Sequence, residues 1–180
     1  MPTIITHAVV PLCIAVAMGP RRISRKVALL GGLLAMVPDL DVVGLRLGVA
    51  YADQWGHRGA THSLLAAGMI TGLIAVVWPA MRRGWNALFL FVSMASHGLL
   101  DTLTSGGLGA ALLWPLNTAR YFAPWRPIRV SPIGSRFFTA RGLETVYSEL
   151  LWVWVPCGLL ALGGYFYWRR RAVHLARADA

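Results

Sequence analysis

The chain has 180 residues, of which 57% are hydrophobic and 13% charged, and its formal net charge is +10. Such an apolar chain cannot hide its hydrophobic surface in one water-soluble core, so the composition indicates an integral membrane protein. The positive charge would suggest nucleic-acid binding in a soluble protein. Here the arginines cluster at the edges of apolar segments, which argues against nucleic acid and makes membrane lipids the expected partners.

The first half of the chain predicts two helices and a region around a site. An apolar segment over 3–18 is followed by a basic loop at 21–26. A second apolar segment, 27–37, is short and rich in glycine. We expect it to end at Pro38, because proline disfavours helical geometry in the residue before it. Residues 39–62 mix glycine, aspartate and histidine, which predicts a loop or short surface helices.

The second half predicts three further helices. Apolar segments cover 63–81 and 86–103, with a tight turn between them. Residues 104–149 are rich in Gly, Pro, Trp and Arg, a composition typical of the headgroup layer, and we expect an interfacial loop region there. The last span is 150–168. The fold class is therefore all-α: a polytopic membrane helical bundle with about four to five spans, forming one domain over 1–180.

Basic residues in short loops predict the orientation of the bundle, because such loops are retained on the cytoplasmic side. The basic clusters at 21–26, 82–83 and 169–171 follow alternate crossings, so a five-crossing arrangement puts all three inside and the N-terminus outside. The 104–149 segment opposes this arrangement, since it lies outside yet carries five arginines. Its length weakens the rule there.

Ligand-type residues gather at the predicted outer helix ends. They are His7, Asp39, Asp41, His57, His62, His97 and Asp101. Burying an ionisable group at membrane depth costs roughly 2.5–3.5 kcal/mol on insertion scales, so such groups usually face a cavity and have a function. His97 and Asp101 are four residues apart, which places both on one helix face. Imidazole with carboxylate is a ligand mixture that zinc, manganese or iron accepts.

Simpler structural explanations exist for several of these residues. His7 alone fits an interfacial histidine. Asp39 or Asp41 fits a helix cap or a partner of Arg58. Thr61 and Ser63 fit caps of the third helix.

The polar motifs together resemble a known family. They are Thr6-His7, Pro38-Asp39-Leu40-Asp41, His57-Arg58-Gly59-Ala60-Thr61-His62-Ser63, Ser96-His97-Gly98-Leu99-Leu100-Asp101 and Trp114-Pro115-Leu116. This set, within about residues 1–135, resembles the YdjM-like family of LexA-regulated inner-membrane proteins described as metal-dependent hydrolases. The resemblance implies a membrane location and a hydrolase. More distantly, the ligand set is similar to that of zinc-dependent phospholipase C and P1-type nucleases, which implies phosphoester substrates.

We therefore expect a membrane-bound metal-dependent hydrolase. Its substrate would be a phosphoester in a lipid or lipid-linked molecule at the outer, periplasmic face of the bacterial inner membrane. A divalent ion, zinc by preference, would polarise the scissile group and lower the pKa of a bound water. The expected ligands are His7, Asp39, His62, His97 and Asp101. Asp41 or His57 would orient or deprotonate the water, and Arg58 would hold an anionic group.

Two competing hypotheses use the same residues without catalysis. The groups could bind a metal structurally or carry ions or protons across the bilayer, or they could form a hydrogen-bonded structural network. A transporter needs polar groups on both sides of the midplane, whereas the inner halves of the predicted helices contain almost none.

Overall fold

The computed structural model describes residues 1–132 and 134–178, with side chains in that part of the chain up to residue 171. These residues form seven α-helices and several short helical turns. The described part of the chain contains two isolated β-bridges, Thr104 with Ile128 and Ala110 with Tyr121, and no strand. The predicted all-α class is confirmed.

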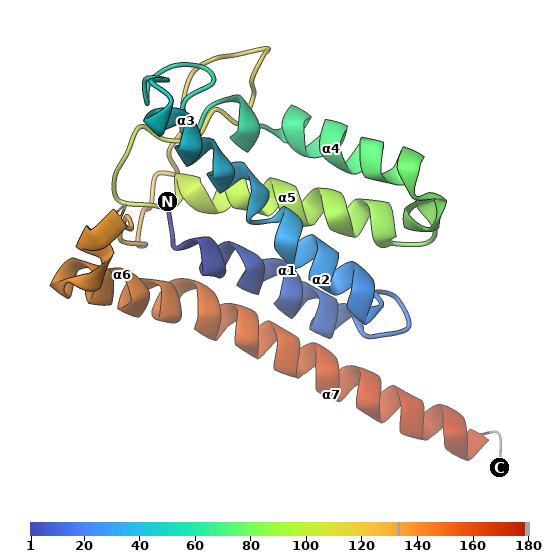
Figure 1. Ribbon diagram of the computed structural model, residues 1–180. Helices are drawn as coiled ribbons and strands as arrows, with labels where there is room; N and C mark the ends of the chain where they lie inside the picture. The colour runs from blue at the N-terminus through green and yellow to red at the C-terminus, as the bar shows by residue number, and fades with distance from the viewer. Residues whose placement is uncertain (133, 179–180) are drawn as a thin grey trace.

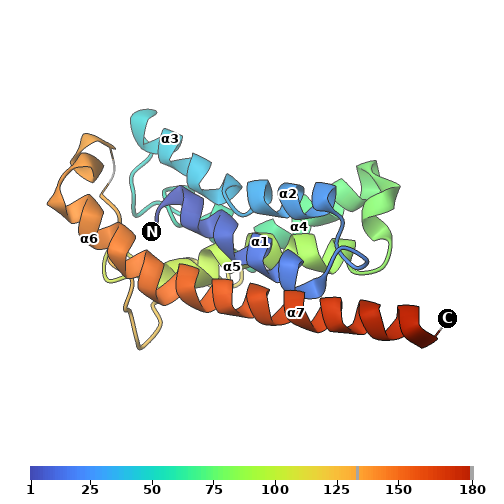
Figure 2. The ribbon, with the colours of Figure 1, turned by 90° about the horizontal axis from the view of Figure 1, so that it is seen from below.

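Five helices lie side by side as a bundle (Figures 1 and 2). They are α1 (Ile4–Met18), α2 (Arg25–Leu34), α4 (Leu64–Val77), α5 (Asn86–Thr102) and α7 (Val155–Ala178). Helix α1 is central, since it packs against α2, α5 and α7, while α4 packs against α5. The start of α1, the end of α5 and the start of α4 meet at one end of the bundle, beside the irregular segments.

After the second helix the chain continues through a helical turn into a short helix. A 3-10 turn over Val37–Asp41 follows α2 and leads directly into α3 (Val42–Arg46). Pro38 is tolerated because it occupies the first turn, where its missing N–H group is not needed. Helix α2 itself ends at Leu34, before Pro38, as expected, and α3 is one of the short helices expected within 39–62. The 3-10 turn that joins them was not predicted, and it places Asp39 and Asp41 within a helical run.

The last helix begins earlier than predicted. Helix α6 (Ala140–Glu149) passes through a π-helical turn over Leu150–Trp154 into α7. The interfacial loop expected over 104–149 is thus wrong for its last ten residues. The physical reason is that 140–155 carries no proline and consists mainly of residues compatible with a helix. The Gly- and Pro-rich part before it is irregular, as expected.

The number of membrane crossings stays a prediction. Two continuous helical runs, Arg25–Arg46 with 22 residues and Ala140–Arg171 with 32, are long and apolar enough to cross a membrane by length and composition. Helices α1 and α4 are apolar but have 15 and 14 residues. A full span usually needs about 20. These shorter helices therefore neither establish nor exclude the predicted four to five spans.

The two ends of the bundle differ in chemistry. Apolar side chains fill the bundle from the end away from the irregular segments to beside the polar cluster: Ala15, Ile23, Val27, Leu34, Met81, Phe89 and Leu90. The basic loops at 21–26 and 82–83 lie at that same end, as does the C-terminal part of α7 (Figure 1). The buried ionisable groups lie at the opposite end, described below.

A buried carboxylate ties the last helix to the first. Glu149 is 1% exposed and accepts hydrogen bonds from the hydroxyl groups of Thr3 and Thr6, both at 2.6 Å, and from the backbone N–H of Thr3. The indole of Trp154 donates to the Thr6 hydroxyl at 2.8 Å. Since Thr6 precedes His7, these bonds hold in place the end of α1 that carries this histidine.

We predict that Glu149→Ala lowers the apparent melting temperature of the detergent-solubilised protein. Hydrogen bonds to a charged group contribute about 1.5–3 kcal/mol each, and the substitution removes the shared acceptor of three donors. The matched control is Glu144→Ala, on the exposed face of the same helix, which should leave the melting temperature unchanged. Equal melting temperatures for the two variants would show that the Glu149 contacts contribute little.

Candidate metal centre

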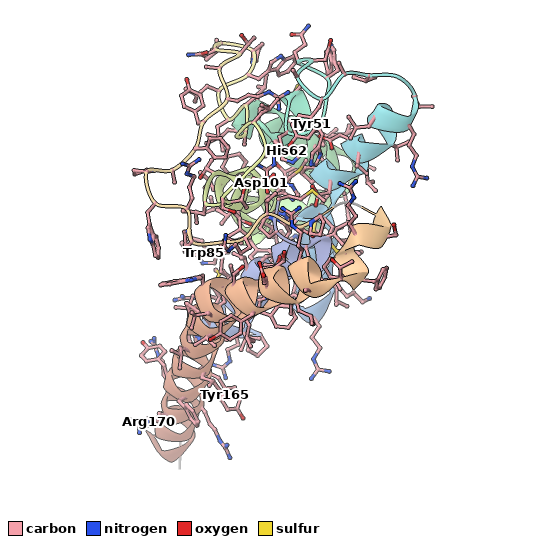
Figure 3. All side chains as sticks on the ribbon, turned by 90° about the vertical axis from the view of Figure 1, so that its left-hand side faces the viewer. Tyr51, His62, Trp85, Asp101, Tyr165 and Arg170 are labelled. Atoms are coloured by element: carbon pink, nitrogen blue, oxygen red, sulfur yellow. The ribbon has the colours of Figure 1, made fainter. Side chains whose placement is uncertain are left out.

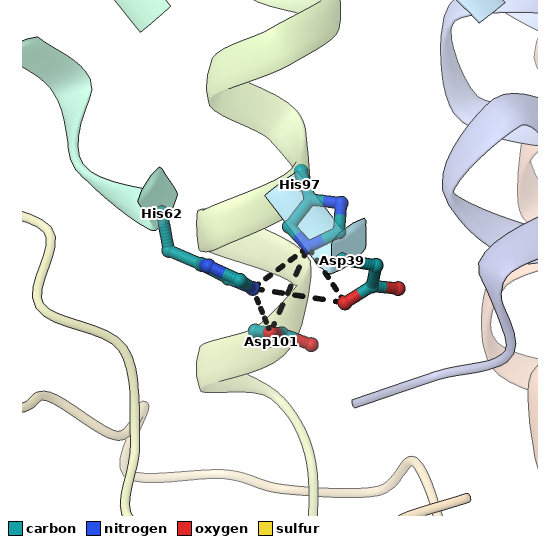
Figure 4. A group of neighbouring side chains, drawn as sticks. All are labelled: Asp39, His62, His97 and Asp101. Carbon is teal, nitrogen blue, oxygen red and sulfur yellow. Dashed lines mark hydrogen bonds and ion pairs between the residues drawn. The ribbon is translucent and has the colours of Figure 1, made fainter. Parts of the chain in front are cut away.

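Four predicted ligands converge at the polar end of the bundle (Figure 4). Asp39 comes from the 3-10 turn after α2, and His62 from the turn Ala60–His62 that precedes α4. His97 and Asp101 come from successive turns of α5. All four are at most 3% exposed. Viewed from this end, His62 and Asp101 lie among the side chains of the helix ends, while Tyr165 and Arg170 lie far along α7 (Figure 3).

The distances among these atoms fit one small cation. His62 Nε2 lies 2.9 Å from His97 Nε2 and 3.2 Å from Asp101 Oδ2, and His97 Nε2 lies 3.3 Å from Asp39 Oδ1. Zinc binds nitrogen and oxygen ligands at about 2.0–2.1 Å, so a tetrahedral site separates neighbouring ligand atoms by about 3.3 Å. The two remaining imidazole–carboxylate distances are longer, 3.7 Å from His62 Nε2 to Asp39 Oδ1 and 3.9 Å from His97 Nε2 to Asp101 Oδ2. The four atoms therefore form a group of the right size for one small cation, without the regularity of an ideal tetrahedron.

The partners of the two rings fix their tautomers. Nδ1 of His97 lies 2.7 Å from the carbonyl oxygen of Ala35, which can only accept, so this nitrogen donates. Nδ1 of His62 lies 3.0 Å from the Thr61 hydroxyl, which itself donates to Asp41 at 2.6 Å, so this nitrogen donates as well. When both rings are neutral, each directs an Nε2 lone pair at the other. A cation between them would satisfy both lone pairs.

Several buried polar atoms of this cluster lack hydrogen-bond partners among the described residues. They are both ring nitrogens of His7, both carboxylate oxygens of Asp39, Oδ2 of Asp101 and Nε of Arg58. Buried polar atoms are normally hydrogen-bonded, and a buried charge is normally paired or bound to a metal. The unpartnered carboxylate oxygens are the observation that most directly favours a bound cation.

His7 joins the cluster from α1 and is 1% exposed, so it is not an interfacial histidine. Its ring stacks on that of His97, with centroids 3.6 Å apart. Nε2 of His7 lies 3.8 Å from Asp39 Oδ2 and 3.8 Å from Asp101 Oδ1. The structure therefore places His7 beside the other four predicted ligands, whereas the compact group, in which all ligand atoms lie within 4.8 Å of one another, consists of Asp39, His62, His97 and Asp101.

Asp41 lies behind His62 and caps no helix through its side chain. Its carboxylate accepts from the Thr61 hydroxyl and from the backbone N–H of Arg58, and it lies 3.2 Å from His62 Nδ1. It also bonds Nδ1 of His57 at 2.5 Å. Asp41 thus holds the loop that carries His62, and it orients the ring that faces the cluster.

Arg58 is fully buried beside Asp101 and adopts a positive φ of 67°. Its Nε lies 3.2 Å from Asp101 Oδ2, and its other nitrogens donate to the Thr104 hydroxyl and the Gly106 carbonyl, each at 3.0 Å. Burial lowers the pKa of this guanidinium, while Asp101 opposes the shift. The carboxylate that pairs with the Arg58 guanidinium is therefore Asp101. The simpler explanation from the sequence had expected Asp39 or Asp41 in that position.

Sequence reasoning missed two supporting residues. Thr104 bonds Arg58, and its place three residues after Asp101 was the available signal. Gly98 lies against the backbone of His62, and a side chain there would collide with the His62 carbonyl group. Of the two predicted caps of the third helix, Ser63 is confirmed, because its hydroxyl accepts from the N–H of Ala66. Thr61 bonds Asp41 instead.

The electrostatics of the cluster favour positive charge at His62. Burial by itself lowers the pKa of this imidazole, but the carboxylates of Asp101, Asp39 and Asp41 outweigh it and raise the pKa well above its ordinary value. A proton or a metal cation would satisfy the same field. A metal ion fits the two facing Nε2 atoms better than a proton does. A single proton shared between His62 and His97 would leave the oxygens of Asp39 without a partner.

An open groove of about 310 Å³ reaches the cluster at Asp39. Its other lining residues are mostly apolar, including Ile4, Ile5, Val42 and Phe137. The groove lies between the start of α1, the turn into α3 and the segment before α6. Asp39 lines this groove, while both of its carboxylate oxygens are buried from the surface.

Together, an apolar helical bundle and a buried imidazole–carboxylate group define a membrane protein with a candidate metal site. The chain belongs to the family described as YdjM inner membrane protein, whose model matches residues 1–172. This confirms the family resemblance and extends it beyond residue 135. The family and its relatives support a location in the inner membrane.

Named relatives are similar over most of this chain. The inner membrane protein YbcI of Escherichia coli is 46% identical over 177 residues, covering 95% of this chain and 100% of the relative. The inner membrane protein YdjM of Escherichia coli is 34% identical over 137 residues, covering 68% of this chain and 61% of the relative. YdjM of Shigella flexneri matches to the same extent. No solved structure matches the chain.

We predict that Asp41→Asn weakens zinc binding by about 10–100-fold, the usual effect of losing a carboxylate that orients a metal-binding histidine. The measurement is the zinc Kd of metal-free protein in detergent, by competition with a chelating dye. Asp53→Asn, at an exposed position in the same region, is the control and should bind zinc like the unaltered protein. Unchanged zinc affinity in Asp41→Asn would show that Asp41 does not orient His62.

Proposed function

We propose that this inner-membrane protein is a metal-dependent hydrolase acting on a phosphoester in a lipid or lipid-linked molecule. The observation that carries the proposal is the set of buried carboxylate and imidazole atoms without hydrogen-bond partners among the described residues. Mixed imidazole and carboxylate ligands suit zinc, and the two cysteines, Cys13 and Cys157, lie elsewhere in the bundle. The resident ion is therefore proposed to be divalent, with zinc preferred.

The proposed ligands are His7, Asp39, His62, His97 and Asp101. When bound, a divalent cation supplies Lewis acidity and a nucleophilic water near neutral pH. The protein contributes rigid placement, because His97 is held through Ala35, His62 through Thr61 and Asp41, and Asp101 through Arg58. Such preorganised ligands need little rearrangement during a reaction.

The roles predicted for Asp41, His57 and Arg58 are supported unequally. The contacts of Asp41 support orientation, since it bonds the ring of a ligand and not the cluster itself. His57 bonds Oδ1 of Asp41, the oxygen that does not face His62. Removal of a proton from water by His57 therefore requires that the other ring nitrogen of His57 faces the substrate. The guanidinium of Arg58 is engaged with Asp101, which supports positioning of that carboxylate over direct binding of an anion.

The groove supports a lipid substrate. An apolar chain lying among Ile4, Ile5, Val42 and Phe137 would bring an attached polar group to Asp39. The protein belongs to an inner-membrane family, so such chains surround it. A water-soluble phosphoester would gain nothing from this lining.

The distribution of polar groups favours hydrolysis over transport. The buried residues at the other end of the bundle are apolar, from Ala15 on α1 to Leu90 on α5. The buried hydroxyls of Thr71 and Ser93 donate to backbone carbonyls of their own helices. A path for ions would need polar groups along its whole length.

The site is proposed to open to the periplasm. The basic loops at 21–26 and 82–83 lie at the end of the bundle opposite the cluster, and basic loops are retained in the cytoplasm. Arg120, one of the opposing arginines, donates to three backbone carbonyl oxygens, at Tyr51, Asp53 and His57. This arginine therefore has a structural role that does not depend on the side of the membrane.

We predict stoichiometric zinc in the purified protein and metal-dependent phosphoester hydrolysis. The assay presents mixed micelles containing phosphatidylglycerol, phosphatidylethanolamine or phosphatidic acid and measures released products by mass spectrometry. His97→Ala and Asp101→Ala should each lose zinc and reduce any activity by more than the roughly 10–100-fold that loss of an outer partner costs, because each removes a ligand of a buried ion. Absence of bound metal after reconstitution, with both variants still folded, would overturn the proposed metal-dependent function.

We predict that the two ends of the bundle react with a membrane-impermeant maleimide from opposite sides. Ala52→Cys, near the cluster, and Ala80→Cys, near the apolar end, are both exposed and would be made in a background lacking Cys13 and Cys157. In cells with a permeabilised outer membrane, Ala52→Cys should react at once. Ala80→Cys should react only after the inner membrane is broken. The reverse result would place the site at the cytoplasmic face.

A further inference from the structure

The carboxylates of Asp39 and Asp101 each face two different groups of imidazoles. Asp39 Oδ1 lies 3.3 Å from His97 Nε2, and Asp101 Oδ2 lies 3.2 Å from His62 Nε2. The opposite oxygens, Asp39 Oδ2 and Asp101 Oδ1, each lie 3.8 Å from Nε2 of His7. One ion bound among His62 and His97 would therefore use only one oxygen of each carboxylate.

The His7 ring is left without a partner by this arrangement. Both of its nitrogens are buried and lack a hydrogen bond within residues 1–132 and 134–178. Its Nε2 is aimed at two carboxylate oxygens that are too distant for hydrogen bonds, whose N–H···O distances are about 2.7–3.2 Å. A cation between the ring and the two oxygens would satisfy His7 Nε2 and Asp39 Oδ2, which lack partners, and would also contact Asp101 Oδ1, to which Arg58 donates at 3.4 Å.

We infer that the cluster holds two divalent cations bridged by Asp39 and Asp101. His62 and His97 complete the first position, and His7 completes the second. The inference rests on the proposed metal-dependent function and adds a second ion to it. Arg58 also contacts Asp101, but each carboxylate oxygen has two lone pairs and can accept both partners.

The two positions differ in how many protein atoms surround them. The first has four, from His62, His97 and the two carboxylates, which is the closed arrangement of a structural zinc site. The second has three, so it keeps coordination positions open for water or substrate, as catalytic sites do. The chemistry is therefore assigned to the His7 position.

The groove lies next to residues of this second position. Thr3, just before α1, and Ile4, in its first turn, line the groove and lie four and three residues before His7, and Asp39 lines it as well. His7 itself is buried. Two dications exceed the charge of the three nearby carboxylates, those of Asp39, Asp41 and Asp101, so an anionic group would be attracted. A phosphate ester attached to an acyl chain has both properties that the groove and the charge select.

A different second position was considered at Asp41, His57 and His62, whose potential ligand atoms also lie close together. His57 Nδ1 and Asp41 Oδ1 are 2.5 Å apart, which is a hydrogen-bond distance and too short for neighbouring ligands of one zinc ion. His62 Nδ1 also donates its proton to that side. These atoms therefore support the first position and do not form another.

The test counts ions in metal-free protein reconstituted with zinc in detergent, by elemental analysis after removal of free metal. His7→Phe keeps a ring stacked on His97 but removes the ligand, and His57→Phe is the matched control at the competing position. We expect two ions per chain in the unaltered protein, one in His7→Phe and two in His57→Phe. Thermal unfolding of each metal-free variant verifies folding.

One ion in the unaltered protein would overturn the second position, whether His7→Phe then holds one ion or none, and would leave a mononuclear hydrolase standing. Loss of an ion only in His57→Phe would move the second position to Asp41. No ion in any variant would overturn the proposed function itself. Should His7→Phe fail to fold, the unaltered protein is reconstituted with manganese and its electron paramagnetic resonance spectrum is recorded. A spectrum of two spin-coupled manganese ions supports the two-ion site, and the six-line signal of an isolated manganese ion overturns it.

Discussion

The arrangement of the polar end depends on two carboxylates buried among apolar helices. Asp39 and Asp101 are almost fully buried, and most of their oxygens lack hydrogen bonds from the described residues. Leaving such charges unpaired in a low-dielectric interior is strongly unfavourable. Three histidines and Arg58 surround the two carboxylates. Arg58 contributes a positive charge, and each histidine contributes a ring nitrogen that carries a lone pair or a proton. The helices that carry these groups are thereby drawn to one point, although they are far apart in sequence.

Each group in that cluster is held by a neighbour that does not itself belong to it. The Ala35 carbonyl fixes His97, the Thr61 hydroxyl and Asp41 fix His62, and Thr104 fixes Arg58. These partners are short side chains or backbone atoms with little freedom to move. Ligands held in this way need little rearrangement to receive an ion.

The sequence predicted the identity of the clustered residues better than the path of the chain. His97 and Asp101 share a helix face by spacing alone, and the placement of His7, Asp39 and His62 followed from the alternating direction of apolar segments. Helix α2 ends before Pro38, as expected, but the 3-10 turn that carries the chain into α3 was not predicted, because the rule for prolines describes only where α-helices end. Which oxygen of each carboxylate faces which ring depends on side-chain rotation, which no sequence pattern encodes.

The tie between Glu149 and the first helix has a consequence for the order in which the protein matures. Thr3 and Thr6 are synthesised first, but their acceptor comes from the beginning of the last helix. Until that helix is made and inserted, the end of α1 that carries His7 is not held against the rest of the cluster. The centre is therefore completed only after Glu149 has been made, and a chain lacking residues beyond 140 would contain every proposed ligand without the contact that fixes one of them.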